Sequence, residues 1–267
     1  MGIFDGSWAN RFGAVLRLKS HGNFIFGSYQ SAGDQPQKYH ICGYGEPSAS
    51  EEGIGLGIVL SMLWRPIERQ KKDESSHWVS GFAGQLFLDE ETLSQLVLNH
   101  AVYVTEASAE VICTGSYVDK DCYIRSDIGG ATLATIGSFR VSDHASPING
   151  VWYCQMPQYD LTLELQLKDG ISGWLDGYLS HKGVKYVMQG FTDNQTDDEI
   201  ERPLKQGLSV CASINDGSLI VLNGYFDSET DQLVLFEQVT QATSLSMNAM
   251  QARSQTCYFG RSRREQD

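Results

Sequence analysis

The sequence predicts an all-β protein built from two tandem antiparallel up-and-down barrels of eight strands each. Two observations lead to this fold class. Short β-rich segments follow one another along the chain, and the landmarks of the first half return in the same order in the second half. The length of 267 residues fits two domains of about 130 residues each.

The first observation is the alternation of apolar and polar residues, which is typical of half-buried strands and not of helices. Turn residues separate the strand-like segments, as at residues 20–23, 31–34 and 119–121. The segments are centred near Val15, Ile25, Tyr39, Val59, Trp78, Leu96, Val104 and Tyr123. A meander of about eight strands must protect its two edges, and closure into a barrel removes both of them.

The second observation is an internal repeat in which each landmark has a later counterpart. Residues 6–8 are echoed by 150–152, 26–31 by 175–180, 39–43 by 186–190, 95–98 by 232–235, and 122–123 by 257–258. The repeat predicts a first barrel over 1–126, a linker over 127–147 and a second, degenerate barrel over 148–267. We expect the two barrels to pack together as an intramolecular pseudo-dimer, and a homodimer is left open.

Composition and charge exclude several classes of partner. The formal net charge of −13 disfavours nucleic acid and anionic membranes, since both require a basic surface. The basic tail from Arg261 to Arg264 is interpreted as a solvated end, and the segment 192–205 is expected to be exposed because it is acidic. No apolar run reaches the length of about 18 residues that crosses a bilayer. The first residues do not resemble a signal peptide.

Six cysteines lie in strand-like segments without metal-ligand spacing, so no metal site is expected. They are interpreted mainly as small buried hydrophobes, and one or more disulfides remain an alternative. The cysteines are Cys42, Cys113, Cys122, Cys154, Cys211 and Cys257.

An ordered set of motifs over residues 6–126 resembles the avidin/streptavidin family. The opening segment 6–10 is similar to the family's first strand, and 27–32 is similar to its G-T/S-Y-x-S-A segment. Trp64 and Trp78 fall where the family places two binding-site tryptophans, and residues 121–123 end the repeat as the family's D-x-F/Y does. The resemblance implies an avidin-like barrel that binds biotin or a similar small molecule, and a secreted or periplasmic location.

The resemblance also implies a role for each site residue. Asn10 and Tyr29 would donate hydrogen bonds to the ureido oxygen, and Asp121 and Ser31 would accept from the ureido N–H groups. Ser76 would face the thiophane sulfur. Trp64 and Trp78 would form the apolar wall around the ring. Biotin would be a ligand and not a cofactor, and no cofactor is expected. Ser75 and the turn 33–35 are candidates for contacts with the carboxylate tail.

Departures from the family pattern imply weaker binding and no family-type tetramer. Ala14 replaces a hydroxyl donor to the ureido oxygen, and Cys113 stands near the position of the tryptophan that a neighbouring subunit lends. A third site tryptophan falls near Val102 or Tyr103, where Tyr103 is the expected substitute.

The second repeat keeps Trp152, Tyr178 and Ser180 but loses the other landmarks of the site. Cys154 is matched to Asn10, Ile214 to Trp64, Thr256 to Asp121 and an apolar residue near Ile220 to Trp78. We therefore expect no family-type urea site there. The second barrel is either a structural partner or a binder of something else.

No enzyme signature is present, because the sequence has no P-loop, G-x-S-x-G or H-E-x-x-H motif. The prediction is thus a non-enzymatic, ligand-binding β-barrel protein with no catalytic residues. Two alternatives stay open: a calycin-like carrier of another small apolar ligand, and a protein-interaction scaffold without a small ligand.

Overall fold

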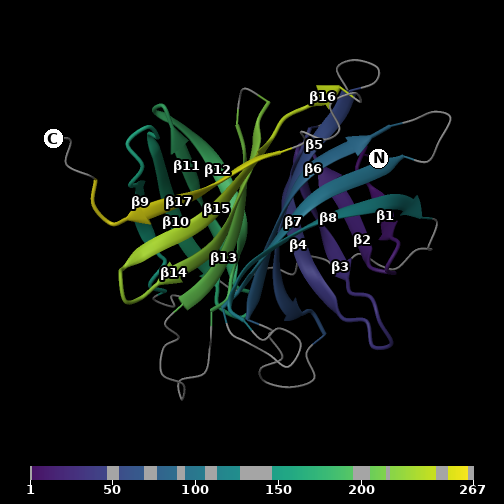
Figure 1. Cartoon of the computed structure of the whole chain (residues 1–267), viewed down its shortest axis with the longest axis horizontal. Helices are drawn as coiled ribbons and strands as arrows, with labels where there is room; N and C mark the ends of the chain where they lie inside the picture. The colour runs from purple at the N-terminus through teal and green to yellow at the C-terminus, as the bar shows by residue number, and fades with distance from the viewer. Residues whose placement is uncertain are drawn as a thin grey trace.

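The structure is a computed structural model that describes residues 2–46, 54–68, 77–88, 94–105, 113–126, 146–194, 205–214, 217–244 and 252–263. These residues form strands, turns and loops without a helix, and two barrels lie side by side with the chain termini at opposite ends (Figure 1). The predicted fold class is therefore confirmed. No helix that is long and apolar enough to span a membrane occurs among these residues.

The first barrel is an antiparallel meander that closes where its fifth and sixth strands pair. Its strands follow the order β5-β4-β3-β2-β1-β8-β7-β6, and β5 pairs with β6 to complete the ring. Their bounds are β1 (Gly6–Asn10), β2 (Val15–His21), β3 (Phe24–Gln30), β4 (Lys38–Gly45), β5 (Ile54–Pro66), β6 (Trp78–Phe87), β7 (Gln95–Val104) and β8 (Gly115–Ser126).

The second barrel closes in the order β10-β11-β12-β13-β14-β15-β17-β9. Its strands are β9 (Gly150–Cys154), β10 (Leu161–Asp169), β11 (Trp174–His181), β12 (Val184–Thr192), β13 (Lys205–Ser213), β14 (Leu219–Asp227), β15 (Gln232–Thr240) and β17 (Arg253–Gly260). The two-residue strand β16 (Thr243–Ser244) leaves this barrel and pairs with β5 of the first one. The expected linker lies outside the described residues except for its last two positions.

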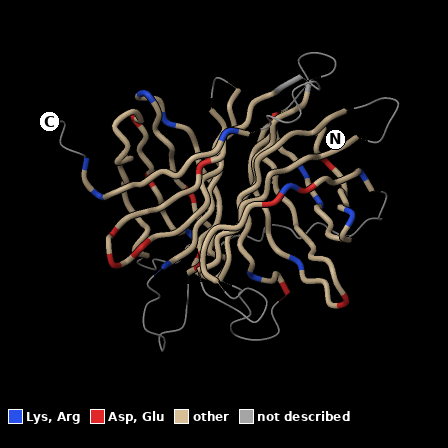
Figure 2. The backbone as a smooth tube through the Cα atoms, viewed as in Figure 1, with Lys and Arg blue, Asp and Glu red and all other residues tan. Residues whose placement is uncertain are grey.

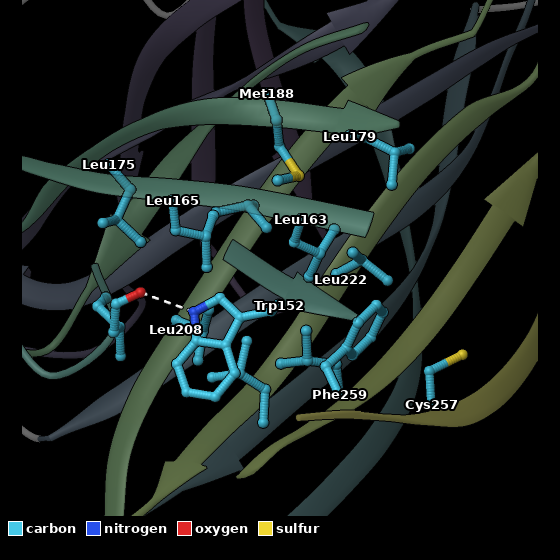
Figure 3. Packing of buried hydrophobic residues seen from close by; sticks show 14 of the residues in the cluster. Trp152, Leu163, Leu165, Leu175, Leu179, Met188, Leu208, Leu222, Cys257 and Phe259 are labelled. Atoms are coloured by element: carbon cyan, nitrogen blue, oxygen red, sulfur yellow. Dashed lines mark hydrogen bonds between the residues drawn. The ribbon is translucent and has the colours of Figure 1, made fainter. Parts of the chain in front are cut away.

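Each barrel is filled by side chains from every second strand position, as the two-residue period of a strand requires. Trp8 is fully buried in the first core and Trp152 in the second, and Figure 3 shows Trp152 beside Leu163 and Phe259. The indole of Trp8 donates to the Phe4 carbonyl over 3.0 Å, and that of Trp152 donates to Ile148 over 2.8 Å. The repeat therefore preserves a buried hydrogen bond as well as a residue type.

In each barrel, an arginine lies over the ring of the buried tryptophan of the first strand. The guanidinium of Arg125 lies 4.7 Å from the ring centroid of Trp8, and that of Arg261 lies 3.6 Å from Trp152. Arg261 also donates to the carbonyl of Asn149 over 2.8 Å. The interpretation of Arg261 as part of a merely solvated tail is therefore wrong, because its charge is placed over an aromatic face.

The barrels pack through β4–β7 of the first and β12–β15 of the second. Ser61 Oγ donates to the Ser209 carbonyl over 2.6 Å, and Ser209 Oγ donates to the Ser80 carbonyl over 2.9 Å. Asn223 Nδ2 donates to the Ala101 carbonyl over 2.9 Å. Two apolar clusters surround these bonds, one with Cys42, Leu63, Val79, Tyr103, Trp174 and Phe191, the other with Tyr44, Val59, Ala83, Cys211, Leu219 and Val221.

An ion pair is also buried between the barrels. Arg65 of β5 places Nη2 2.9 Å from Asp193 Oδ1, and His77 Nδ1 lies 2.8 Å from Asp193 Oδ2. The side chains of Arg65 and Asp193 are 8% and 3% exposed. The expectation that the segment beginning at Thr192 is exposed is therefore wrong for Thr192 and Asp193, because both are held at this junction.

The cysteines are all free thiols, and three of them, Cys42, Cys211 and Cys257, are buried. Cys154 is partly buried, whereas Cys113 and Cys122 are exposed. The interpretation as buried hydrophobes thus holds for only half of the set. Figure 2 shows basic and acidic residues on both barrels.

Candidate functional site

Five of the seven predicted site residues come together at one end of the first barrel. Asn10 ends β1, Tyr29 lies near the end of β3, Trp64 lies near the end of β5, Trp78 begins β6, and Asp121 lies on β8. The other end is closed by apolar side chains, among them the ring of Phe4. The barrel therefore has one polar, aromatic end and one apolar end.

Asn10 and Asp121 join the first and last strands of the barrel at this end. Asn10 Nδ2 lies 3.5 Å from Asp121 Oδ1, and Tyr123 donates to Asp121 Oδ2 over 3.1 Å. Asn10 Oδ1 accepts from the backbone N–H groups of Phe12 and Ala14, at 3.0 and 2.9 Å. These two bonds fix the amide so that its NH₂ group faces Asp121.

Burial sets the protonation of the polar groups. It raises the pKa of Asp121 above 3.8, while hydrogen bonds from Tyr123 and Asn10 act in the opposite direction. Burial also raises the pKa of Tyr29 to about 12, with a further contribution from the nearby charge of Asp121. The Tyr29 phenol therefore stays a neutral O–H donor at neutral pH, beside a carboxylate that is an acceptor when ionised.

Aromatic rings form the wall of the site. The Trp64 ring lies 5.6 Å from Tyr29, 5.0 Å from Tyr39 and 5.6 Å from Trp78, measured between centroids. Trp64 Nε1 donates to Ser80 Oγ over 2.7 Å, which fixes its ring. Trp78 Nε1 is buried and has no hydrogen-bond partner among the described residues.

His100 lies deeper in the same wall. Its ring stacks on Phe82 with centroids 4.1 Å apart, and its Nε2 lies 2.9 Å from Ser80 Oγ. Burial lowers the pKa of His100 to about 4, although the charge of Asp119 acts in the opposite direction. His100 is therefore a neutral hydrogen-bonding group at neutral pH.

The two predicted serines are a separate case. Ser31 Oγ accepts from the backbone N–H of Gln37 over 3.0 Å and so anchors the loop between β3 and β4. Ser76, like Ser75, lies outside the described residues. Tyr103, the expected substitute for a third tryptophan, faces the second barrel instead and stacks on Tyr225 at 4.5 Å. That prediction is wrong because Tyr103 has the strand parity of the outward-facing Val79 and Ala101.

The sequence did not predict four further residues of the site, which are Tyr39, Ser80, Phe82 and His100. Strand parity contains the signal for two of them, because Ser80 and Phe82 stand two and four positions after Trp78 and face the same side. His100 is opposite Phe82 in the pairing of β6 with β7. Its position could be found only once that register was known.

Strand register corrects the match between the two repeats. In the first barrel, Trp8 pairs with Leu16, which pairs with Tyr29 on the next strand. In the second barrel, Trp152 pairs with Leu163, which pairs with Leu179. Leu179, and not Tyr178, therefore occupies the position of Tyr29. Tyr178 lies on the outer face and is 43% exposed. Ser180 has the same parity, so His181 takes the position of Ser31. A shift of one residue moves every side chain of a strand to the other face. Matching by residue type therefore assigned Tyr178 and Ser180 to the wrong positions.

The same reasoning changes two other matches. Asn10 pairs with Tyr123 and Cys154 with Phe259, so Cys257 and not Thr256 occupies the position of Asp121. The position of Trp78 is occupied by Ser218 and not by an apolar residue near Ile220. The other two matches, of Cys154 to Asn10 and of Ile214 to Trp64, agree with the register.

Within the described residues, no group of three or more His, Cys, Asp or Glu side chains is arranged to hold a metal ion. Comparison of the sequence with protein-family models and with curated proteins gave no match.

Proposed function

We propose that the chain is a non-enzymatic binding protein whose first barrel takes biotin or a similar small cyclic urea. The observation that carries the proposal is the grouping of Asn10, Tyr29 and Asp121, from three separate strands, at the aromatic end of one barrel. A small eight-stranded barrel has an interior of the size that holds one small ligand.

The available polar atoms match the groups of a cyclic urea. The Tyr29 hydroxyl and the NH₂ group of Asn10 would donate to the ureido oxygen, and the Tyr29 hydroxyl has no hydrogen-bond partner among the described residues. Asp121 keeps acceptor capacity on both oxygens for a ureido N–H. Such bonds are strong where water is excluded, because one partner is charged.

Trp64 and Trp78 supply the apolar contact for the rest of a bicyclic ligand. The strands that carry them, β5 and β6, lie against the second barrel, and Ser209 bonds to the backbone of Ser80 in the same wall. In this proposal the second barrel supports the site mechanically and takes no part in urea binding, since Leu179, Cys154 and Cys257 replace the three polar groups.

Calorimetric titration of the full chain with biotin tests the proposal. We expect saturable binding at one site per chain, quenching of tryptophan fluorescence and a higher melting temperature, because a ligand that binds only the folded state stabilises it. Absence of biotin binding would refute the proposal. A response to fatty or aromatic ligands would then favour the apolar carrier, and a response to no small molecule would favour the scaffold.

A further inference from the structure

The second barrel carries a different polar cluster at the end that corresponds to the urea site. The registers place Glu237 at the position of His100, because Phe82 pairs with His100 and Leu222 pairs with Glu237. Cys154, Cys257 and His181 take the positions of Asn10, Asp121 and Ser31. The equivalent ends of the two barrels therefore carry different polar side chains.

Glu237 is the centre of this cluster and is only 3% exposed. Both of its direct partners use one carboxylate oxygen: Gln255 Nε2 donates to Oε2, and Arg253 Nη2 lies 3.7 Å from Oε2. The other oxygen, Oε1, has no hydrogen-bond partner among the described residues. A buried carboxylate with a free oxygen is an acceptor that a ligand can complete.

The charge on Glu237 is poorly compensated. Arg253 is the cation nearest to it in the described structure, and the Arg253 side chain is 64% exposed. Burial raises the pKa of Glu237 above 4.5, and Gln255, Arg253 and His181 act in the opposite direction. A cation brought into the barrel would therefore stabilise the carboxylate more than solvated Arg253 does.

A second unpaired polar atom belongs to the same region. His181 Nδ1 is buried and has no hydrogen-bond partner in the part of the chain that the structure describes, and the ring is close enough to influence Glu237. Tyr159, in the loop after β9, donates to Gln255 Oε1 over 2.8 Å and links this loop to the cluster. Met156 of the same loop packs on the core. The loop and the carboxylate thus meet at one end of the barrel.

In the second barrel, the positions that correspond to the aromatic wall of the first site carry smaller side chains. Leu179 replaces Tyr29, Ile214 replaces Trp64 and Ser218 replaces Trp78. Leu179 and Ile214 belong to the apolar core of the second barrel, as do Cys257 and Phe259, which Figure 3 shows together. An apolar wall beside one acidic group suits a ligand with an apolar body and a single N–H-rich end.

We propose that the second barrel binds a small organic cation, an amine or amidine on an apolar body, with its N–H groups on Glu237 and its body against Leu179 and Ile214. This inference concerns another barrel and another ligand class than the urea site. It stands or falls independently of biotin binding.

The test is calorimetric titration of the full chain with benzylamine and benzamidine, and with benzyl alcohol and benzamide as neutral counterparts of similar shape. We expect the two cations to bind at one site per chain, and the neutral compounds to bind at least about 30-fold more weakly because they lack the charge that pairs with the carboxylate. Equal binding of cations and neutral compounds would overturn the proposal. So would the absence of cation binding at millimolar concentration.

Variants locate the site. Glu237→Gln should weaken benzamidine binding by about 30-fold or more, whereas Glu229→Gln, on an exposed turn, should leave it unchanged. Arg253→Ala, an exposed change that should not affect folding, should tighten benzamidine binding several-fold because it removes a competing cation. Unchanged benzamidine affinity in both Glu237→Gln and Arg253→Ala would refute the assignment. Biotin binding should persist in both, so failure of one site is distinguishable from failure of the other.

Discussion

Asn10 Nδ2 lies 3.5 Å from Asp121 Oδ1, so a side-chain pair joins the first and last strands of the first barrel at its aromatic end. The two residues are 111 positions apart in the chain, and β1 and β8 bring them together. Because Asn10 Oδ1 is occupied by two backbone N–H groups, Asp121 is the side chain that holds the Asn10 NH₂ group in this direction.

Asp121→Ala should weaken biotin binding by about 2 to 4 kcal/mol, or roughly 30- to 1000-fold, because it removes an acceptor and leaves Asn10 unsupported. Calorimetric titration measures the change. Glu164→Ala is the matched control, since it removes an exposed carboxylate on the outer face of the second barrel and should not affect biotin. Tyr178→Phe should also have no effect. If either control lost biotin binding while Asp121→Ala kept it, the biotin site would lie in the second barrel and our assignment to the first would be wrong.

Ala14→Ser should tighten biotin binding by about 1 to 2 kcal/mol, or roughly 5- to 30-fold, by adding a donor next to Asn10. Ala14 is buried, and its backbone N–H already bonds to Asn10 Oδ1. The same hydroxyl should lower the melting temperature of the unliganded protein, since a buried donor without a partner is unfavourable. Ala9→Ser, on the adjacent strand and the opposite face, is the control. Weaker binding in Ala14→Ser would contradict the placement of the ureido oxygen.

Strand alternation and the repeat were sufficient to predict both barrels, because burial on one face forces a two-residue period that survives without any family match. The same period was not applied strictly within the repeats. The letters Tyr178 and Ser180 match Tyr29 and Ser31, yet the pairing of β10 with β11 puts both on the outside. Register depends on contacts between distant strands, and local similarity does not determine it.

The buried polar groups show the other limit. Asp193 follows β12 at the start of an acidic stretch, and nothing in the local sequence distinguishes it from the other carboxylates of that stretch. It is buried because Arg65, 128 positions earlier, meets it across the barrels. Glu237 is likewise one of many acidic residues until the closed barrel places it inside. Such sites arise from tertiary packing and could not be predicted from the sequence pattern.

The free energy of unfolding should decrease as the pH is lowered from about 6.5 to about 4, because of His100. Burial lowers the pKa of His100 in the folded protein to about 4 from an ordinary 6.5, so the unfolded chain binds this proton first. The contribution is fully present above pH 6.5, decreases as the pH falls and levels off below about 4, with a size on the order of 2 kcal/mol after allowance for partial exposure.

The measurement is the melting temperature between pH 7 and 4.5 in the original protein and in His100→Gln. Glutamine keeps a hydrogen-bonding group near Ser80 but does not titrate, and the other histidines are common to both proteins. We expect a smaller loss of stability in His100→Gln over this range. Parallel curves would show that His100 is not held neutral by burial.

Arg65→Met should destabilise the protein by about 3 kcal/mol, because it leaves Asp193 buried without its main counter-charge and removes three bonds to backbone carbonyls. His77 remains beside Asp193, so the loss should fall at the low end of the range for a broken buried pair. Lys38→Met is the control, since Lys38 pairs with Glu68 at 4.0 Å on the exposed surface and should change stability by less than about 1 kcal/mol.

Urea unfolding of both variants and of the double variant Arg65→Met with Asp193→Leu separates the causes. If the loss in Arg65→Met comes from the uncompensated carboxylate, removing that carboxylate as well should restore much of the stability, because the replacement of a buried pair by apolar residues is often nearly neutral. If the double variant is less stable than Arg65→Met, the bonds of Asp193 to its other neighbours matter more than its charge. A stability change in Arg65→Met no larger than that in Lys38→Met would mean that this ion pair does not hold the two barrels together.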